Sequence, residues 1–540
     1  MTRELTPIEV LRLYPPHRRT LWSLLESRAA TVPEKEFIAF DGLSLSYREV
    51  LAQASRTASM LAARGVREGD RVGVMSQNHP STVLLHYALA RLGAVMVPVN
   101  PDYGVEEARY VLSHAQVCGA LGSPATLATL RAACAGIQPA PWLMLNEHPT
   151  QGSGTEPVIG DEIAKASALP PPETGRPESP CVFIYTSGTT GFPKGVMHAQ
   201  KSVVMAGEGF VGRMHIQPEE RLMAVLPMFH VNALCYSLTG ALAAGATLIP
   251  VPKFSASAFW KSVAGTRATL VNTIAAITAI LMRRPREEFV PGHTLRKIYG
   301  APLTQEMYDV FQNEFGVPHL IEGYAMSEIP GVLSNPFDGL RKVGSMGKPS
   351  LHPDPAIRLA EMRVVDDEGR ELPDGETGEL VVRTPIVMLG YFRDEAQTKA
   401  SFRDGWFLTG DLGRRDEDGY FWFVARKKDI IRKRGENISG AELDRVVSSH
   451  PEVLEAAAIA VPDELGEDEI LVAAVLKPGA TLTPRGIADW CAQHLAPIKV
   501  PRYVAIEADL PHTPTHRVAK FRMRADAGLK ARAIDLKPAG

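Results

Sequence analysis

The segment from Tyr185 to Val196 (YTSGTTGFPKGV) combines residue types that can bind phosphate. It holds four Ser and Thr hydroxyls, three glycines and one lysine, and the β-rich run CVFIY leads into it. Glycines let the backbone wrap closely around a phosphate, exposed N–H groups and hydroxyls donate to its oxygens, and Lys194 adds a compact positive charge. The segment departs from the Walker pattern because Pro193 stands where that motif has glycine before lysine. A plain surface loop is the alternative, but the lysine and the flanking strand residues favour a phosphate loop.

The same segment resembles the signature of the acyl-adenylate-forming superfamily, which includes acyl-CoA synthetases, firefly luciferase and the adenylation domains of peptide synthetases. Further motifs of the superfamily follow in its order along nearly the whole chain. They are LPMFH from Leu226, YGAPL from Tyr299, GYAMSE from Gly323, WFLTGD from Trp406, and Arg426. Because several independent motifs keep this order, the chain is identified as a member of the superfamily.

The resemblance implies a site for ATP. YGAPL is similar to the adenine-binding turn, Ser327 keeps the hydroxyl of a more common threonine at the α-phosphate, and Asp411 with Arg426 resembles the ribose contacts. Read alone, Asp411 would be an ordinary turn residue. The implied nucleotide-binding residues are Thr186, Ser187, Gly188, Thr189, Thr190, Gly191, Lys194, Gly300, Ala301, Pro302, Gly323, Tyr324, Ala325, Met326, Ser327, Asp411 and Arg426.

The implied chemistry explains why positive charge is needed. A carboxylate is a poor electrophile, so it is first joined to AMP as a mixed anhydride, and fixed cations with Mg²⁺ offset the repulsion between the two anions. The resemblance makes Lys194 and Glu328 catalytic residues and places Mg²⁺ at Glu328 and Thr190. A carboxylate is the hard oxygen ligand that this ion prefers. A surface glutamate after a turn is the alternative for Glu328.

His230 follows Phe229 in the motif that borders the acyl pocket of the family. By itself such a histidine is more often a core residue. The resemblance implies a catalytic-site gate beside the acyl or pantetheine channel, and not a general base.

The superfamily performs two half-reactions by rotating its C-terminal domain, and the charged run from Arg426 resembles the hinge, with Lys428 at the pivot. The following loop is similar to the one that enters the site with the thiol substrate. It supplies the predicted CoA-binding residues Arg434, Gly435, Glu436 and Asn437. Arg434 replaces a glycine that is common in the family. The basic run 432–434 could contact phosphates of CoA or the nucleotide, or could be a solvated surface run.

The largest departure from the family lies near the C-terminus. An ungapped register places Arg517 where the family carries the lysine that bridges the carboxylate and the α-phosphate. Arginine keeps the charge but has a planar, differently hydrated head group. Lys520 could take the role only if the loop folds differently, so Arg517 is favoured. The alternatives are a slow enzyme biased to thioester formation, or a non-catalytic protein that binds nucleotide or acyl groups.

Within the superfamily, the run KFSASAFW from Lys253, with Arg267-Ala268-Thr269 and the Gly-Glu-Asn loop, is most similar to carnitine/crotonobetaine–CoA ligases. The expected activity is ATP-dependent ligation of a small carboxylic acid to coenzyme A, and loading of an acyl carrier protein is the alternative acceptor. The acyl pocket is expected to draw on His230, residues 272–277 and residues 300–328. Glu322 is the one strong charge noted there, so an apolar, medium-sized acyl group of fatty acid metabolism is predicted.

The elements that must position these residues alternate between helices and buried strands. Helices are predicted over 47–64 and 81–92, strands over 71–75 and 94–99, and the run 233–245 is predicted as a helix. This pattern predicts an α/β fold, with a large N-terminal domain of layered mixed or parallel sheets and helices plus a small β-rich subdomain after Leu359. The tail predicts a small, mobile α+β domain. The expected domains are 1–427 and 428–540.

Bulk composition limits the remaining classes of function. The chain has 540 residues and a formal net charge of −3, so it lacks the overall basic field of a nucleic-acid binder. Its five cysteines are scattered, which disfavours a zinc site or disulfide framework and fits a reducing cytoplasm. The longest apolar stretch, Ala233 to Val251, is interrupted by Gly and Pro, so no integral membrane span is expected. Homodimer formation is a further expectation.

Overall fold

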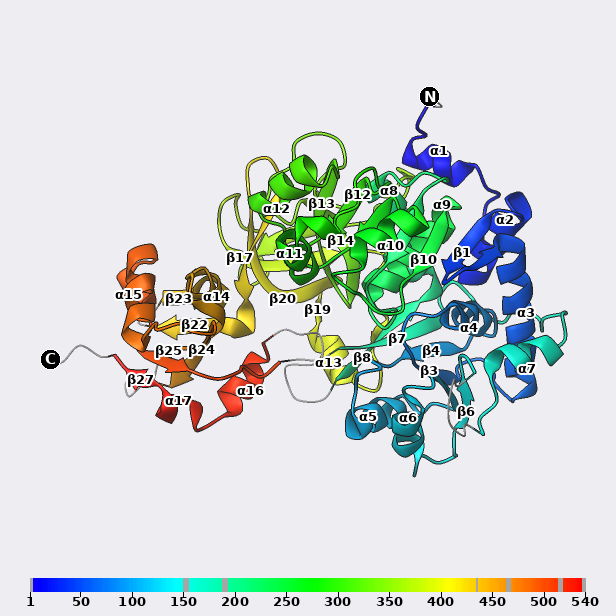
Figure 1. Ribbon diagram of the computed structural model, residues 1–540, viewed down its shortest axis with the longest axis horizontal. Coiled ribbons are helices and arrows are strands. Elements are labelled where there is room, and N and C mark those ends of the chain that lie inside the picture. Colours follow the sequence, from blue (N-terminus) through cyan, green and yellow to red (C-terminus); the bar gives the residue numbers. More distant parts are fainter. Residues whose placement is uncertain are drawn as a thin grey trace. The chain divides into compact units, whose positions relative to one another are not determined.

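The computed structural model describes residues 3–148, 155–186, 193–433, 436–462, 468–512 and 518–536, and only the backbone of Asn437 (Figure 1). The chain divides into two compact units. The N-terminal unit comprises Met1–Thr186, Pro193–Met362 and Val382–Phe407, and the C-terminal unit comprises Arg363–Val381 and Leu408–Gly540. The predicted hinge boundary between residues 427 and 428 lies inside the second range and stays a prediction.

A nine-stranded mixed sheet forms one layer of the N-terminal unit. The strands from β13 to β1 are mutually parallel, and the edge strands β2, β14 and β15 pair antiparallel. The order is β15 (Lys348–Pro349), β14 (Ile329–Ser334), β13 (His319–Met326), β12 (Lys297–Gly300), β11 (Leu270–Asn272), β9 (Arg221–Ala224), β10 (Thr247–Pro250), β1 (Glu36–Phe40) and β2 (Leu43–Ser46). Parallel strands of this kind are buried on both faces, which explains their continuous apolar runs.

A seven-stranded sheet forms a second layer. Its strands from β7 to β6 are parallel, and β8 and β18 extend the sheet antiparallel. The order is β18 (Gly390–Tyr391), β8 (Lys194–Ala199), β7 (Pro180–Thr186), β4 (Val95–Pro98), β3 (Arg71–Met75), β5 (Gly119–Gly122) and β6 (Trp142–Leu145). The predicted strands 71–75 and 94–99 correspond to β3 and β4.

Local sequence determines where the helices begin and which side they bury. In α3 (Tyr47–Ala63) the Ser46 side chain accepts a hydrogen bond from the N–H of Glu49, and Glu49 reciprocates, which forms a capping box. Its buried residues recur at three- and four-residue spacing along one face. By contrast, α4 (Pro80–Arg91) is buried at every position from Pro80 to Ala90, as expected of a helix packed on several sides. Figure 1 shows α4 beside the seven-stranded sheet, and α3 packs against α4.

Further helices complete the N-terminal unit. They are α1 (Pro7–Arg12), α2 (Leu21–Thr31), α5 (Val105–Ala115), α6 (Leu127–Cys134), α7 (Ile159–Lys165), α8 (Gln200–Met214), α9 (Thr239–Ala244), α10 (Phe259–Thr266), α11 (Ala275–Arg283), α12 (Gln305–Asp309) and α13 (Glu395–Ala400), with the single turns η2 (Arg286–Glu288) and η3 (Val310–Glu314). The run predicted as one helix over 233–245 is a π-helix, η1 (Asn232–Leu238), followed by α9. Apolar periodicity alone does not separate these two helix types.

A small β-rich subdomain follows, as the charged turns after Leu359 predict. It contains β16 (Glu361–Val365), β17 (Gly378–Arg383), β20 (Trp406–Arg415) and β19 (Phe402–Arg403) in that order, and β21 (Phe421–Arg426) pairs with β20. The turn η4 (Lys427–Asp429) leads from β21 into the hairpin of β22 (Ile430–Lys433) and β23 (Glu436–Ser439).

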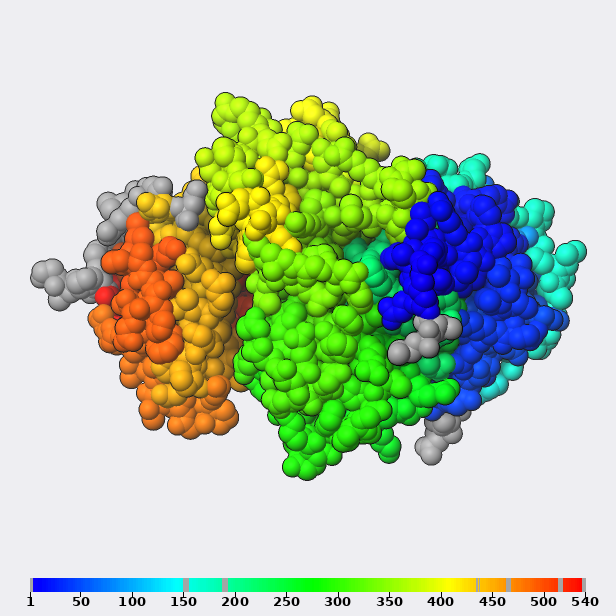
Figure 2. All heavy atoms as spheres, turned by 90° about the horizontal axis from the view of Figure 1, so that it is seen from above, coloured from blue at the N-terminus to red at the C-terminus, as the bar shows by residue number. Residues whose placement is uncertain are grey.

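The C-terminal α+β region packs helices on both faces of one sheet. The sheet order is β24 (Val453–Pro462), β25 (Asp468–Leu476), β26 (Tyr503–Ile506) and β27 (Ile534–Asp535). Alternate residues of β25 enter different cores: Ile470 and Val472 pack with α14 (Gly440–Ser448) and α15 (Pro484–His494), whereas Leu471 and Ala473 pack with α16 (Lys520–Ala525) and α17 (Leu529–Arg532). Figure 2 shows α14 and α15, in amber and orange, on one face of this region. The turn η5 (Pro497–Lys499) precedes β26.

The predicted α/β class with mixed sheets, a β-rich subdomain and a C-terminal α+β region is therefore confirmed. Within the described residues, no helix is long and apolar enough to cross a membrane.

Candidate active site

Lys194 and Glu328, predicted to contact phosphate and Mg²⁺, lie on either side of Tyr391 in the N-terminal unit. The Tyr391 hydroxyl donates a hydrogen bond to Glu328 Oε1 at 2.7 Å, and Lys194 Nζ lies 5.3 Å from the centroid of the Tyr391 ring. Lys194 begins β8, directly opposite Thr186 at the end of β7. The intervening predicted residues Ser187, Gly188, Thr189, Thr190 and Gly191 lie outside the described residues.

The turn that carries Ser327 and Glu328 connects β13 to β14 and is held from two sides. His198 Nε2 bonds the Ser327 carbonyl at 2.7 Å, and the Met388 N–H donates to the Glu328 carbonyl at 2.8 Å. Burial lowers the pKa of His198 to about 4, so the ring is neutral at pH 7 and donates its single N–H here. The turn is therefore fixed through its backbone as well as through the Glu328 side chain.

Within the described part of the chain, Lys194 and Glu328 each have polar atoms that are not used by a hydrogen bond or an ion pair. Glu328 is 9% exposed, and its Oε2 accepts no hydrogen bond from a described residue. Lys194 has no acidic partner among the described residues. An oxygen that is free to bind a cation and an ammonium that is free to bind an anion suit a Mg²⁺–nucleotide complex.

The predicted adenine-binding residues lie at the carboxyl ends of two adjacent parallel strands. Gly300 is the last residue of β12 and is in register with Glu322 of β13, and Ala301 and Pro302 follow directly after the strand. Glycine is required at Gly323, because a Cβ there would lie 2.3 Å from the Tyr299 hydroxyl and 2.8 Å from the Leu333 carbonyl oxygen. Tyr324, Ala325 and Met326 complete β13. The carboxyl ends of parallel strands are the usual ligand side of such sheets.

Glu322 ties this turn to a neighbouring loop. Its carboxylate accepts hydrogen bonds from the N–H groups of Leu303 at 2.9 Å and Gly344 at 3.0 Å. Burial raises the pKa of Glu322 to about 7, against the lowering effect of those two donors. Glu322, the charged residue predicted for the acyl pocket, is therefore hydrogen-bonded to two backbone N–H groups.

Asn78 fixes the segment that leads to His230, the residue predicted to border the acyl pocket. Its Nδ2 donates to the carbonyls of Ala224 (3.2 Å), Leu226 (3.0 Å) and Val251 (3.0 Å), and its Oδ1 accepts from the Met228 N–H at 2.7 Å. The His230 ring packs against Phe229 with centroids 4.4 Å apart.

The predicted ribose contacts meet each other in the C-terminal unit. Asp411 and Arg426 are antiparallel partners on β20 and β21, and Arg426 Nε lies 3.3 Å from Asp411 Oδ1. Asp411 is buried and Arg426 is half-exposed. The two side chains are therefore direct neighbours within this unit.

The hinge and loop predictions fall on a short charged stretch of the same unit. Lys428 lies in η4, where burial lowers its pKa, and Lys427 is held by Asp367 at 2.9 Å and Glu379 at 3.0 Å. Glu436 and the Asn437 backbone belong to β23, whereas Arg434 and Gly435 lie outside the described residues. Lys433, in the basic run, is buried and pairs with Glu469 at 2.6 Å.

The two candidates near the C-terminus differ in what the structure describes. Lys520 Nζ lies 2.6 Å from Asp444 Oδ2, and both side chains are largely buried. Arg517 lies outside the described residues. Lys520 is therefore occupied by a carboxylate of its own unit.

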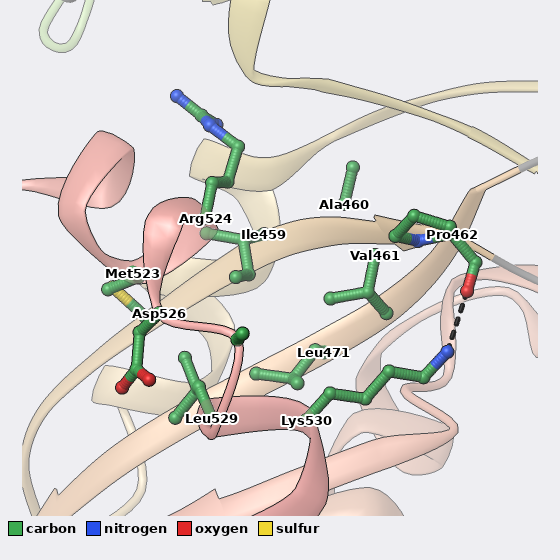
Figure 3. A pocket seen from close by; sticks show the side chains of 11 residues that line it. Ile459, Ala460, Val461, Pro462, Leu471, Met523, Arg524, Asp526, Leu529 and Lys530 are labelled. Atoms are coloured by element: carbon green, nitrogen blue, oxygen red, sulfur yellow. Dashed lines mark hydrogen bonds between the residues drawn. The ribbon is translucent and has the colours of Figure 1, made fainter.

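A pocket of about 180 Å³ in the C-terminal unit contains none of the predicted residues (Figure 3). Apolar side chains of β24, β25, α16 and α17 line it together with the charged Arg524 and Asp526, and Lys530 donates to the Pro462 carbonyl at 2.6 Å at its edge.

Sequence reasoning missed Asn78, His198 and Tyr391. Asn78 stands before His79-Pro80, a pattern that signals a helix start and not a clamp on other strands. His198 and Tyr391 sit in short apolar runs, where histidine and tyrosine are ordinarily core residues.

Comparison with known proteins identifies the family. Residues 25–392 match the AMP-binding enzyme family, and residues 442–517 match the AMP-binding enzyme C-terminal domain. The chain is 33% identical to sulfoacetate–CoA ligase of Cupriavidus necator, with 93% of this chain and 97% of the relative covered. It is 30% identical to crotonobetaine/carnitine–CoA ligase of Shigella dysenteriae, with 89% and 93% covered. The crystal structure of ATP-bound MatB from Rhodopseudomonas palustris is similar with a TM-score of 0.81 at 28% identity, covering 96% of this chain and 99% of that one. The resemblance inferred from the motifs is confirmed: the chain belongs to the AMP-binding enzyme family.

Proposed function

We propose that this chain is an ATP-dependent acid–thiol ligase that activates a carboxylic acid as acyl-AMP and transfers the acyl group to coenzyme A. The observation that carries the proposal is the cluster of Lys194, Tyr391 and Glu328, in which, among the described residues, the lysine has no acidic partner and one oxygen of the carboxylate accepts no hydrogen bond. Family membership and the two CoA ligases among the relatives support the same activity.

Each residue has a defined part in the proposed reaction. Lys194 contacts the phosphates of ATP, the ends of β12 and β13 hold the adenine, and Asp411 with Arg426 binds the ribose. Mg²⁺ at Glu328 would neutralise phosphate charge, which lowers the repulsion felt by the incoming carboxylate. His198 and the Met388 N–H keep the Ser327–Glu328 turn in place while the charge redistributes.

Arg517, and not Lys520, takes the place of the family's adenylating lysine in this proposal. The ion pair between Lys520 and Asp444 supports this choice, because removing Lys520 from it would leave a largely buried carboxylate without its cation. Rotation about Lys428 between the two half-reactions, with 1–427 and 428–540 as the moving parts, belongs to the same proposal.

The test is acid-dependent release of pyrophosphate from ATP across a panel of carboxylates, with and without CoA. The panel contains sulfoacetate, crotonobetaine, carnitine and medium-chain fatty acids, because two relatives are named for the first three and the last carry the kind of apolar, medium-sized acyl group that the sequence predicts. Formation of an acyl-CoA is the expected result. ATP binding with no acid-dependent pyrophosphate release would contradict the proposal.

The thiol acceptor is decided in a parallel assay. Acyl transfer to free CoA is compared with transfer to a phosphopantetheinylated acyl carrier protein at equal thiol concentration. Faster loading of the carrier protein would show that the acceptor is a tethered thiol and not free CoA. Homodimer formation and a cytoplasmic location stay predictions, checked by sedimentation and by cell fractionation.

A further inference from the structure

Tyr391 touches both charged residues of the phosphate and metal cluster. Its hydroxyl is bonded to Glu328 Oε1 at 2.7 Å, and its ring lies 5.3 Å from Lys194 Nζ. Tyr391 is 9% exposed, so most of its surface is shielded from bulk water. Hydrogen bonds to a charged group and cation–π contacts are both stronger where water is excluded.

The backbone around Tyr391 is fixed to the strand that begins with Lys194. In β18, Tyr391 is in register with Val196 and Gly390 with Met197, while the N–H of Phe392 donates to the Gly195 carbonyl at 2.8 Å. Gly390 has a φ of +142°, a conformation that favours glycine, and the Tyr391 N–H donates to Thr398 Oγ1 at 2.9 Å. The ring therefore has little freedom to leave the cluster.

The direction of this hydrogen bond is fixed by chemistry, because an ionised carboxylate can only accept and the phenol hydroxyl donates. The bond occupies one acceptor site of Glu328 Oε1 and restrains the carboxylate, whereas no hydrogen bond from a described residue reaches Oε2. Oε2 is therefore the less occupied of the two oxygens and the better placed to bind a cation.

We propose that Tyr391 is a positioning residue of the metal and phosphate site. Its hydroxyl selects the orientation of Glu328 in which Oε2 is presented to Mg²⁺, and its ring holds the Lys194 ammonium within reach of the phosphates. The inference rests on the proposed function, since it takes Glu328 as the metal ligand and Lys194 as the phosphate contact.

The decisive variant is Tyr391→Phe, which removes the hydroxyl and keeps the ring. Its matched control is Tyr87→Phe, because the buried Tyr87 hydroxyl has no hydrogen-bond partner in the described structure. The first readout is Mn²⁺ affinity of the ATP-bound protein, measured by electron paramagnetic resonance. We expect Tyr391→Phe to bind Mn²⁺ roughly tenfold more weakly, because a hydrogen bond to a charged group is lost, and Tyr87→Phe to match the wild type.

The second readout separates positioning from simple damage to the fold. The Mg²⁺ concentration for half-maximal pyrophosphate release should rise by a similar factor in Tyr391→Phe, and saturating Mg²⁺ should restore the rate. The KM for ATP at saturating Mg²⁺ should stay near the wild-type value, because the ring still contacts Lys194. Tyr391→Leu, which also removes the ring, should raise that KM a further few-fold.

Wild-type Mn²⁺ affinity in Tyr391→Phe would overturn the inference, as would a lost rate that excess Mg²⁺ does not restore. Failure of the proposed function looks different. It is the absence of acid-dependent pyrophosphate release by the wild-type protein, and the Mn²⁺ titration of the ATP-bound protein still decides the role of Tyr391 in that case.

Discussion

Lys520 and Asp444 form an ion pair of 2.6 Å in the C-terminal unit, where both side chains are mostly shielded from water. Desolvation raises the pKa of Asp444, whereas Lys520 and the Ala458 N–H, which donates to Oδ1 at 2.6 Å, lower it. The carboxylate therefore depends on Lys520 for its charge. A lysine with such a partner joins α16 to α14 and is poorly suited to leave for a substrate.

Lys520→Met should destabilise the protein, and its cost should vanish when Asp444 is changed too. We expect a loss of about 2 kcal/mol in the free energy of unfolding, below the cost of breaking a fully buried pair. Urea denaturation of Lys520→Met, Asp444→Asn and the double variant measures the coupling. Additive losses in the double variant would show that the pair contributes no coupling energy.

Arg517→Ala should abolish acid-dependent pyrophosphate exchange while leaving thermal stability near that of the wild type. Arg517→Lys restores the residue type of the family and should retain or increase the exchange rate, because the positive charge is kept. Exchange unchanged in Arg517→Ala but lost in a stably folded Lys520→Met would reverse the assignment.

Glu322 should make the free energy of unfolding fall as the pH rises. Its pKa is about 7 in the folded protein against an ordinary value of 4.5, so the folded chain binds a proton that the unfolded chain has released. This contribution is fully present below pH 4.5 and is lost as the pH rises through 7, at about 1.4 kcal/mol per pH unit.

The free energy of unfolding is measured for the wild type and for Glu322→Gln at pH 5 and pH 7.5. The difference between the two proteins isolates the contribution of Glu322, since every other titrating group is common to both. The stability of Glu322→Gln relative to the wild type should increase with pH. Parallel stability curves would contradict the shifted pKa.

Asn78→Ala should weaken binding of the acid more than binding of ATP. The change leaves the Leu226 and Val251 carbonyls and the Met228 N–H without their amide partner, which costs about 1–3 kcal/mol for each buried group left unsatisfied. The Ala224 carbonyl still accepts from the Val251 N–H at 3.1 Å. The loosened segment leads to His230, so the KM for the acid should rise more than the KM for ATP. Asn100→Ala is the control, because Asn100 is also buried but its Oδ1 accepts a single backbone hydrogen bond, from Asp102. Equal effects at the two positions would argue for a general loss of packing.

Gly323→Ala should impair ATP binding severely, whereas Gly160→Ala should be neutral or slightly stabilising. The new methyl group at Gly323 would meet the Tyr299 hydroxyl at 2.3 Å and the Leu333 carbonyl at 2.8 Å, and at Gly160 nothing lies within 4 Å. Gly160 is in α7, where alanine is favoured by up to about 1 kcal/mol. Isothermal titration with ATP and a thermal melt of each variant check both halves of this expectation.

Much of the architecture could be predicted from the sequence because its signals are local. The capping pattern and apolar spacing of α3 lie within 18 residues of the chain, and the observed helix Tyr47–Ala63 ends one residue before the predicted end at 64. Strands β3 and β4 are runs of buried apolar residues, which parallel sheets covered on both faces require. The π-helix at Asn232–Leu238 was missed because its hydrogen-bond pattern leaves no separate trace in apolar periodicity.

The candidate site could be predicted only where a motif marks it. Lys194 and Glu328 belong to segments of unusual composition, but Tyr391 lies in a two-residue strand and meets Glu328 across 63 residues of sequence. That contact depends on the pairing of β18 with β8, a tertiary event. Lys433 illustrates the opposite error: a basic run that reads as a solvated or ligand-binding surface contains a lysine buried against Glu469.

This buried pair has a mechanical consequence. Lys433 is the last residue of β22, and Glu469 lies in β25. The ion pair therefore links the β22–β23 hairpin to the sheet of the C-terminal region. Any turn of that region about Lys428 would therefore move strands β22 and β23 together with the sheet, as one body.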